Sequence, residues 1–176
     1  MRSLVDVERI HRFMQALGRE ADHPARVYLT GGATAVLSGW RESTIDVDIK
    51  IVPDVDRVFR AIPEIKERLQ INVELASPDD FIPVREDWQD RSPFITREGR
   101  LAFHHFDLYA QALAKIERGH AQDAVDVREM FERGLIETAK LLEYFSSIEP
   151  RLYRYPAIDA KSFRLALDDA VRMTPE

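Results

Sequence analysis

Residues 27–51 read VYLTGGATAVLSGWRESTIDVDIKI. The pattern predicts a short apolar strand, a turn at Gly31 and Gly32, a short helix, and a second strand that carries Asp46 and Asp48. Because side chains alternate along a strand, both aspartates are expected on one face and their apolar neighbours on the other. Two carboxylates that close repel each other unless a cation or a shared proton lies between them. A glycine turn before a helix offers backbone N–H groups to a phosphate. The stretch therefore predicts a site for a metal ion and a nucleotide.

Composition limits the classes of protein that this chain can belong to. Its 176 residues are 45% hydrophobic and 32% charged, which suits a packed core and a solvated surface. The chain has no cysteine, so disulfides and thiolate metal sites are excluded. The net charge of −6 argues against a broad nucleic-acid-binding surface. The charged N-terminus is unlike a signal peptide, and no apolar run approaches the ~20 residues of a membrane span. We expect a cytoplasmic protein with no membrane partner.

The flanking segments predict further helices and strands. Helical spacing indicates a helix over 3–17, with Ser3 as its cap and Gly18 as its stop. Asp54 is expected to cap another helix, which Pro63 interrupts. A short strand, a long loop and a hairpin are expected next, over 71–75, 77–92 and 94–106.

From Asp107 onward the hydrophobic period becomes helical. Four amphipathic helices are expected, the first three ending near Gly119, Gly134 and Pro150. The order predicts an α/β (α+β) fold, with a mixed sheet flanked by helices. The expected division is an α/β core over 1–106 and a helical C-terminal part over 107–176 that packs on the core.

The glycine pair and the two aspartates carry a family resemblance. Leu29-Thr30-Gly31-Gly32, thirteen residues, and then Asp46-Val47-Asp48-Ile49 resembles the signature of the DNA polymerase β-like nucleotidyltransferase superfamily. The fuller run GGATAVLSGWRESTIDVDI looks most like the AbiEii-type toxin nucleotidyltransferases and related uncharacterised minimal nucleotidyltransferase-fold proteins. Those proteins share an Arg-x-x-Thr-x-Asp-x-Asp run, which Arg41, Thr44, Asp46 and Asp48 match. The resemblance is strongest over residues 27–51 and weaker over 107–130.

The resemblance implies a nucleotidyltransferase-like fold and a Mg²⁺-dependent reaction, with Mn²⁺ as an alternative ion. A nucleotidyl group would pass from an NTP to a hydroxyl on RNA (such as tRNA), on a protein or on a small molecule. Asp46 and Asp48 would be catalytic and would hold the metal. The nucleotide would be bound by residues of the same stretch, namely Gly31, Gly32, Arg41 and Thr44. A toxin role, with an antitoxin as partner, is implied by the same likeness.

The superfamily usually adds a third carboxylate from a neighbouring strand. Glu74 is the best candidate for this catalytic and metal-binding role, because it lies on the polar face of the short strand INVEL. Many relatives carry Asp at this position. Asp79 and Asp80 are the competing choice, although a loop or helix-capping role suits them better.

A second motif lies in the helical part. Lys115, then Asp123 and Asp126, resembles a Lys followed by a Lys-Asp-x-x-Asp helix in the toxin family. Lys115 would reach a phosphate, and the two aspartates, three residues apart on one helix face, would orient Lys115 or a nucleotide hydroxyl. Gln122 stands where relatives usually have a basic residue. The alternative is an ordinary solvated face with surface ion pairs.

Other interpretations remain open. His104 and His105 are expected on opposite faces of a strand, so we interpret them as structural. The chief rival function is a catalytically silent nucleotidyltransferase-fold protein that binds a nucleotide or a partner. A weaker rival is a sugar-nucleotide transferase that uses its two aspartates for Mn²⁺, which would leave the glycine turn without a role.

Overall fold

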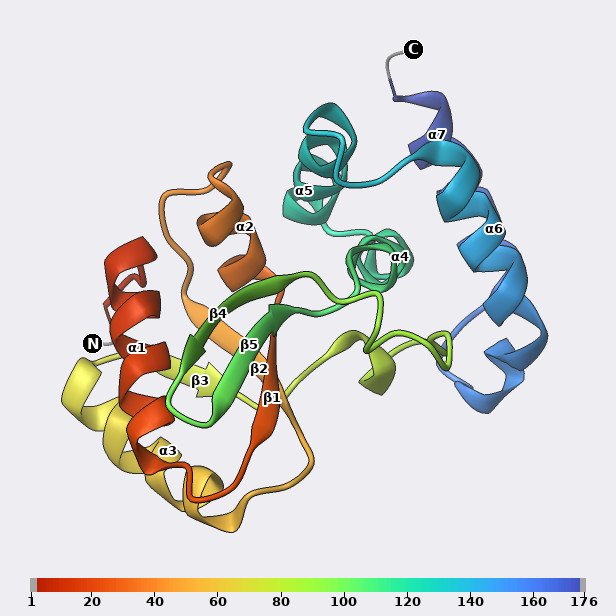
Figure 1. The fold of residues 1–176 in the computed structure, drawn as a ribbon. Helices are drawn as coiled ribbons and strands as arrows, with labels where there is room; N and C mark the ends of the chain where they lie inside the picture. The colour runs from red at the N-terminus through yellow and green to blue at the C-terminus, as the bar shows by residue number, and fades with distance from the viewer. Residues whose placement is uncertain (1–2, 175–176) are drawn as a thin grey trace. The chain divides into compact units, whose positions relative to one another are not determined.

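The computed structural model describes residues 3–174, which form two compact units (Figure 1). The first unit contains the described residues up to Ser77 together with Ser92–Phe106, and the second contains Pro78–Arg91 and the described residues from Asp107 onward. The chain therefore changes unit at Phe106 and also on either side of the segment 78–91. The segment 78–91 belongs to the helical unit, whereas the sequence analysis assigned it to the α/β core.

Five strands form one mixed sheet in the first unit, in the order β3-β2-β1-β5-β4. The strands are β1 Ala25–Thr30, β2 Asp46–Val52, β3 Asn72–Glu74, β4 Phe94–Glu98 and β5 Leu101–His105. β1 is antiparallel to β2 and parallel to β5, whereas β3 pairs with β2 in the parallel direction. β4 and β5 form the expected hairpin, with Gly99 in its turn at a φ of 58°. The mixed α/β fold predicted from the sequence is confirmed.

Three helices complete the first unit: α1 Val7–Glu20, α2 Gly32–Ser38 and α3 Asp56–Leu69. α1 and α3 lie side by side against one face of the sheet (Figure 1). The helical spacing of Ile10, Phe13 and Leu17 gives α1 an apolar stripe, and all three side chains are fully buried. They meet sheet residues such as Val27 and Val47, which are also fully buried. The opposite face of the sheet carries the polar side chains of β2.

Two helices, α1 and α3, differ from the prediction. Asp6 rather than Ser3 caps α1, because its side chain accepts a hydrogen bond from Arg9 N, and the helix continues through Gly18 to Glu20. Asp54 does not cap α3, since the cap residue is Val55. Pro63 lies inside α3 without ending it, because apolar residues on both sides of the proline keep the helix packed on the core.

The second unit consists of helices around a buried core of aliphatic and aromatic side chains. Its α-helices are α4 Leu108–Arg118, α5 Ala121–Glu132, α6 Thr138–Ile148 and α7 Ala160–Arg172, and its 3₁₀ helices are η1 Pro78–Asp80 and η2 Glu149–Arg154. Phe145 of α6 and Phe163 of α7 meet edge to face with ring centroids 5.0 Å apart. All four predicted helices are present. Among the helices of residues 3–174, none is both long enough and apolar enough to span a membrane.

The segment 78–91 is tied to the helices of this second unit by hydrogen bonds. The Tyr155 hydroxyl donates to the Asp79 carbonyl at 2.8 Å, and the Arg151 guanidinium donates to the Val84 carbonyl at 3.0 Å. The Tyr144 hydroxyl accepts from Arg85 N at 3.1 Å. These contacts explain why a segment that the sequence describes as a loop is an integral part of the helical unit.

Candidate functional site

The two aspartates of β2 lie on the polar face of the sheet. Asp46 and Asp48 are half-buried, whereas Val47 and Ile49, which alternate with them, are 0% and 1% exposed in the core. β2 lies between β1 and β3, and Asp48 pairs with Thr30 of β1 on one side and with Glu74 of β3 on the other. The alternation predicted from the sequence is confirmed, and it presents two carboxylates to the same side of the sheet.

The glycine turn approaches one of these carboxylates. Gly31 precedes α2 with φ 62° and ψ −127°, a conformation that residues with a Cβ atom rarely adopt. A Cβ built on Gly31 would lie 3.1 Å from Asp48 Oδ2, which shows how near the turn passes to the aspartate. The structure therefore brings the glycine turn and Asp48 together, although seventeen positions separate them in the sequence.

The Arg-x-x-Thr part of the motif lies against the second glycine. A Cβ built on Gly32 would overlap Thr44 Oγ1 and would lie 3.1 Å from Arg41 Nη1. Thr44 is itself held on two sides. Its hydroxyl donates to the Asp46 carbonyl at 3.1 Å, and its backbone exchanges two hydrogen bonds with Val5 at 2.8 and 2.9 Å. Thr44 thus joins the glycine turn to the start of β2, and Arg41 lies beside the same turn.

Glu74, the predicted third carboxylate, is the exposed last residue of β3. It pairs with Asp48 in the parallel register, as Asn72 pairs with Asp46. Asn72 Nδ2 donates to Asp46 Oδ1 at 2.5 Å and to Glu74 Oε1 at 3.1 Å. No sequence motif points to Asn72, but it lies two residues before Glu74, and this spacing places both side chains on the same face of the strand. Asp79 and Asp80, the competing candidates, lie in η1 of the other unit.

The donor set on this face suits a hard divalent cation. Magnesium in proteins is commonly held by one or two carboxylates, with the remaining positions taken by water and substrate phosphates. Asp46 and Asp48 offer two carboxylates of this kind, and Glu74 adds a third in register with Asp48. Within residues 3–174, no three or more His, Asp or Glu side chains are already arranged around a metal position. The residues therefore fit an ion that is completed by substrate oxygens rather than one enclosed by protein alone.

The second motif forms a buried ion-pair cluster in the helical unit. Lys115 of α4 is 8% exposed, and its Nζ lies 2.8 Å from Asp126 Oδ2 and 3.8 Å from Asp123 Oδ1. Arg118 binds Asp123 with two hydrogen bonds, of 2.8 and 2.6 Å. Burial raises the pKa of Asp123, but Arg118 and then Lys115 outweigh burial, so its pKa is below the ordinary value.

These contacts distinguish a solvated helix face from a buried cluster at the second motif. The interpretation of a solvated face is wrong for Asp123 and Asp126, which are 1% and 0% exposed. The expectation that the aspartates orient Lys115 agrees with the 2.8 Å contact to Asp126. Gln122 joins the cluster, since its Nε2 donates to Asp126 Oδ1 at 3.2 Å. A nucleotide contact from Lys115, Asp123 or Asp126 stays a prediction.

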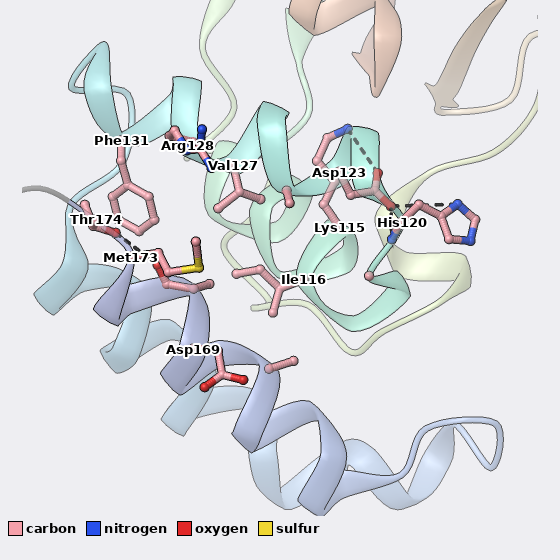
Figure 2. A pocket seen from close by; sticks show the side chains of 14 residues that line it. Lys115, Ile116, His120, Asp123, Val127, Arg128, Phe131, Asp169, Met173 and Thr174 are labelled. Atoms are coloured by element: carbon pink, nitrogen blue, oxygen red, sulfur yellow. Dashed lines mark hydrogen bonds and ion pairs between the residues drawn. The ribbon is translucent and has the colours of Figure 1, made fainter.

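A mainly apolar cavity of about 270 Å³ adjoins this cluster in the helical unit (Figure 2). Helices α4, α5 and α7 line it. Figure 2 shows Lys115 and Asp123 at one end of the cavity and Phe131, Met173 and Thr174 at the other. Lys115 and Asp123 therefore contribute polar atoms to one end of a cavity that is lined mostly by carbon atoms.

The two histidines of β5 point to different partners, as predicted. The His104 ring lies 5.6 Å from the Tyr28 ring, and its Nδ1 is 2.9 Å from the Ser92 carbonyl. His105 Nδ1 lies 3.0 Å from Thr34 Oγ1. Burial, with a smaller effect of His104, lowers the pKa of His105 to about 4. Both rings are thus fixed by neighbours within the first unit, in agreement with a structural role.

Comparison with known families agrees with this geometry. Residues 6–164 match the model of a family described as nucleotidyltransferase of unknown function (DUF6036). The matched range includes the glycine turn, the aspartates of β2 and most of the helical unit. No curated protein and no solved structure matches the chain. The narrower likeness to AbiEii-type toxins stays a prediction. Because the match covers most of its length, the chain belongs to the DUF6036 family of nucleotidyltransferases of unknown function.

Proposed function

We propose that this protein transfers a nucleotidyl group from an NTP to a hydroxyl acceptor in a Mg²⁺-dependent reaction. The observation that carries the proposal is the approach of the glycine turn to the carboxylates of β2. A Cβ on Gly31 would lie 3.1 Å from Asp48 Oδ2, and Asp46 lies on the same face of the sheet. A triphosphate bound at the turn would therefore lie beside two carboxylates.

The residues of the chain have separate tasks in this reaction. The acceptor oxygen forms a bond to the α-phosphorus, the bond to the bridging oxygen breaks, and pyrophosphate leaves. Asp46 and Asp48 would hold the metal, which supplies charge neutralisation for the triphosphate when it is bound. Glu74, in register with Asp48, is the candidate that takes the proton of the acceptor hydroxyl.

The glycine turn and Arg41 would hold the triphosphate. The turn has no side chains that would keep a phosphate away from its backbone N–H groups. The Arg41 guanidinium lies beside Gly32 and can bind two phosphate oxygens at once, which a lysine ammonium cannot do in the same planar geometry. Thr44 acts indirectly, because it fixes Gly32 against the start of β2.

Replacement of the aspartates tests the catalytic proposal. Asp46→Asn and Asp48→Asn keep the shape of each side chain but remove its charge. We expect either change to reduce the transfer of label from a radioactive NTP, and the release of pyrophosphate, by at least about 100-fold. Asp54→Asn is the matched control, because Asp54 is exposed just beyond β2 and should leave the activity unchanged.

The outcomes separate the rival functions. Labelling by an Asp46→Asn/Asp48→Asn double variant at the wild-type rate would exclude the catalytic proposal. NTP binding by the wild type without any release of pyrophosphate would instead indicate the catalytically silent binding protein. Turnover of UDP- or GDP-sugars with Mn²⁺, but not of NTPs, would indicate the sugar-nucleotide transferase.

We further propose a physiological role for this transfer: the protein acts as the toxin of a toxin–antitoxin pair, with RNA or a protein as its acceptor. The support is the Arg41-x-x-Thr44-x-Asp46-x-Asp48 run, which resembles AbiEii-type toxins. Expression in a bacterial host should arrest growth, and Asp48→Ala should relieve the arrest. Equal growth of cells that express wild type and Asp48→Ala would contradict the toxin role without affecting the nucleotidyl-transfer proposal.

A further inference from the structure

We propose that Asn72 is a positioning residue of this site, whose side-chain amide restrains the Asp46 and Glu74 side chains beside Asp48 before a divalent cation binds. The inference rests on the proposed function, because it concerns the same metal site. It adds a residue that does not bind the ion but determines how well the carboxylates bind it.

The contacts of Asn72 support this role. Its side chain is on the polar face of the sheet beside Asp46, its partner in the parallel register. Nδ2 donates to Asp46 Oδ1 at 2.5 Å and to Glu74 Oε1 at 3.1 Å. Asn72 is 9% exposed, so its amide group has little contact with water. One amide group therefore connects two carboxylates from neighbouring strands.

The chemistry of the amide explains why asparagine suits this position. An NH₂ group carries two hydrogens, so it can donate one hydrogen bond to each carboxylate without adding charge. The amide oxygen cannot face the same two groups, because carboxylates at neutral pH only accept hydrogen bonds. Each hydrogen bond uses one carboxylate oxygen, and a carboxylate has two, so binding of a cation is compatible with both bonds.

The amide also reduces the cost of bringing the carboxylates together before the ion arrives. Carboxylates that face each other across two strands repel, and a donor between them offsets part of that repulsion. Groups that orient metal-binding carboxylates commonly change metal affinity by about 10–100-fold when they are removed. An alanine at position 72 removes both hydrogen bonds and leaves the Asp46 and Glu74 side chains without this restraint.

Binding of Mn²⁺ in the absence of any NTP tests the inference directly. Calorimetry or electron paramagnetic resonance should show the Kd of Mn²⁺ rising about 10–100-fold in Asn72→Ala relative to the wild type. Gln15→Ala is the matched control, since it removes an exposed amide from α1 and should leave the Kd unchanged. Asn72→Ser, which keeps a polar group at the site, is measured in parallel in case Asn72→Ala does not fold.

Asn72→Asp provides a second test, in which the Tm is measured with and without Mn²⁺. A fourth carboxylate would increase repulsion in the metal-free protein, so its Tm without metal should fall below that of the wild type. Mn²⁺ should then raise the Tm of Asn72→Asp by more than it raises the Tm of the wild type. A purely structural role for Asn72 would lower the Tm of each variant without this larger response to metal.

Activity distinguishes positioning from folding. In Asn72→Ala, the Mg²⁺ concentration for half-maximal pyrophosphate release should rise, and saturating Mg²⁺ should restore most of the wild-type kcat. Equal Mn²⁺ affinity in Asn72→Ala and the wild type would overturn the inference and leave the proposed function intact. Mn²⁺ binding that weakens as expected in a protein without transfer activity would support the inference and overturn the proposed function. A wild type that does not bind Mn²⁺ would overturn both.

Discussion

At the scale of single residues, Gly31 combines an unusual backbone conformation with a position next to Asp48 of the candidate site. Its φ of 62° and ψ of −127° are rarely accessible to residues with a Cβ, and a Cβ would lie 3.1 Å from Asp48 Oδ2. We expect Gly31→Ala to reduce the free energy of unfolding by about 1–3 kcal/mol, from backbone strain. Transfer activity should fall by more than this loss of folded protein explains, because Asp48 must move.

Gly134 offers the matched control for this substitution. It also has a positive φ, 69°, but nothing lies within 4 Å of the position where its Cβ would stand. Gly134→Ala should therefore reduce stability in urea unfolding while transfer activity per folded molecule stays at the wild-type level. Equal activity in Gly31→Ala and Gly134→Ala would show that the contact of the glycine turn with Asp48 does not matter for transfer.

At the scale of secondary-structure elements, the ion pair between Lys115 and Asp126 joins α4 to α5. The Nζ–Oδ2 distance is 2.8 Å, and the side chains are 9% and 0% exposed. Lys115→Met removes one partner and leaves a buried carboxylate without its closest cation. We expect the free energy of unfolding in urea to fall by about 3–5 kcal/mol.

Two further comparisons show whether the loss of stability in Lys115→Met comes from the buried ion pair. Arg133→Ala breaks a half-exposed pair, at 3.0 Å, between the C-cap residue of α5 and Glu129, and should cost about 0–1 kcal/mol. Asp126→Leu combined with Lys115→Met removes both charges of this pair and should recover much of the lost stability. If Lys115→Met were as stable as Arg133→Ala, the cluster would not hold α4 against α5. A nucleotide role for Lys115 would then gain weight.

At the scale of the whole molecule, His105 makes stability depend on pH. Its folded pKa is about 4 because of burial and then His104, against 6.5 as its ordinary value. A lowered folded pKa means that the unfolded chain binds more protons between these values. The stabilisation is therefore complete above about pH 6.5 and is lost as the pH falls toward 4. The full effect is at most roughly 3 kcal/mol.

Replacement of this histidine tests the pH effect. His105→Asn keeps a polar partner for Thr34 but cannot take up a proton in this range, so urea unfolding from pH 7 to 4 should show a shallower loss of stability. Carboxylates also titrate near pH 4, so the comparison is made between variants. His11→Asn, at an exposed position of α1, should retain the wild-type slope. The same slope in His105→Asn would contradict the assignment.

The sequence predicts most of the elements because their signals are local. The alternation of Asp46 and Asp48 with buried residues identifies β2, and Gly39 ends α2 as expected. The predicted helix boundaries are wrong where a local sequence signal, such as a capping residue or a proline, is overridden by packing on the core. The sequence predicts Ser3 as the cap of α1, whereas the observed cap is Asp6, and the helix begins where Ile10 and Phe13 reach the core. Helix α3 likewise continues through its proline because its apolar face packs on both sides.

By itself, the sequence determined the parts of the site that depend on one segment. The common face of Asp46 and Asp48 follows from strand alternation, and the glycine turn follows from Gly31 and Gly32. Only the tertiary structure decided that Asn72 and Glu74 stand beside those aspartates, since strand order and register depend on which apolar faces pack together. The burial of the Lys115–Asp126 pair is decided in the same way. Spacing along the chain describes a helix face, whereas burial depends on the helices that cover it.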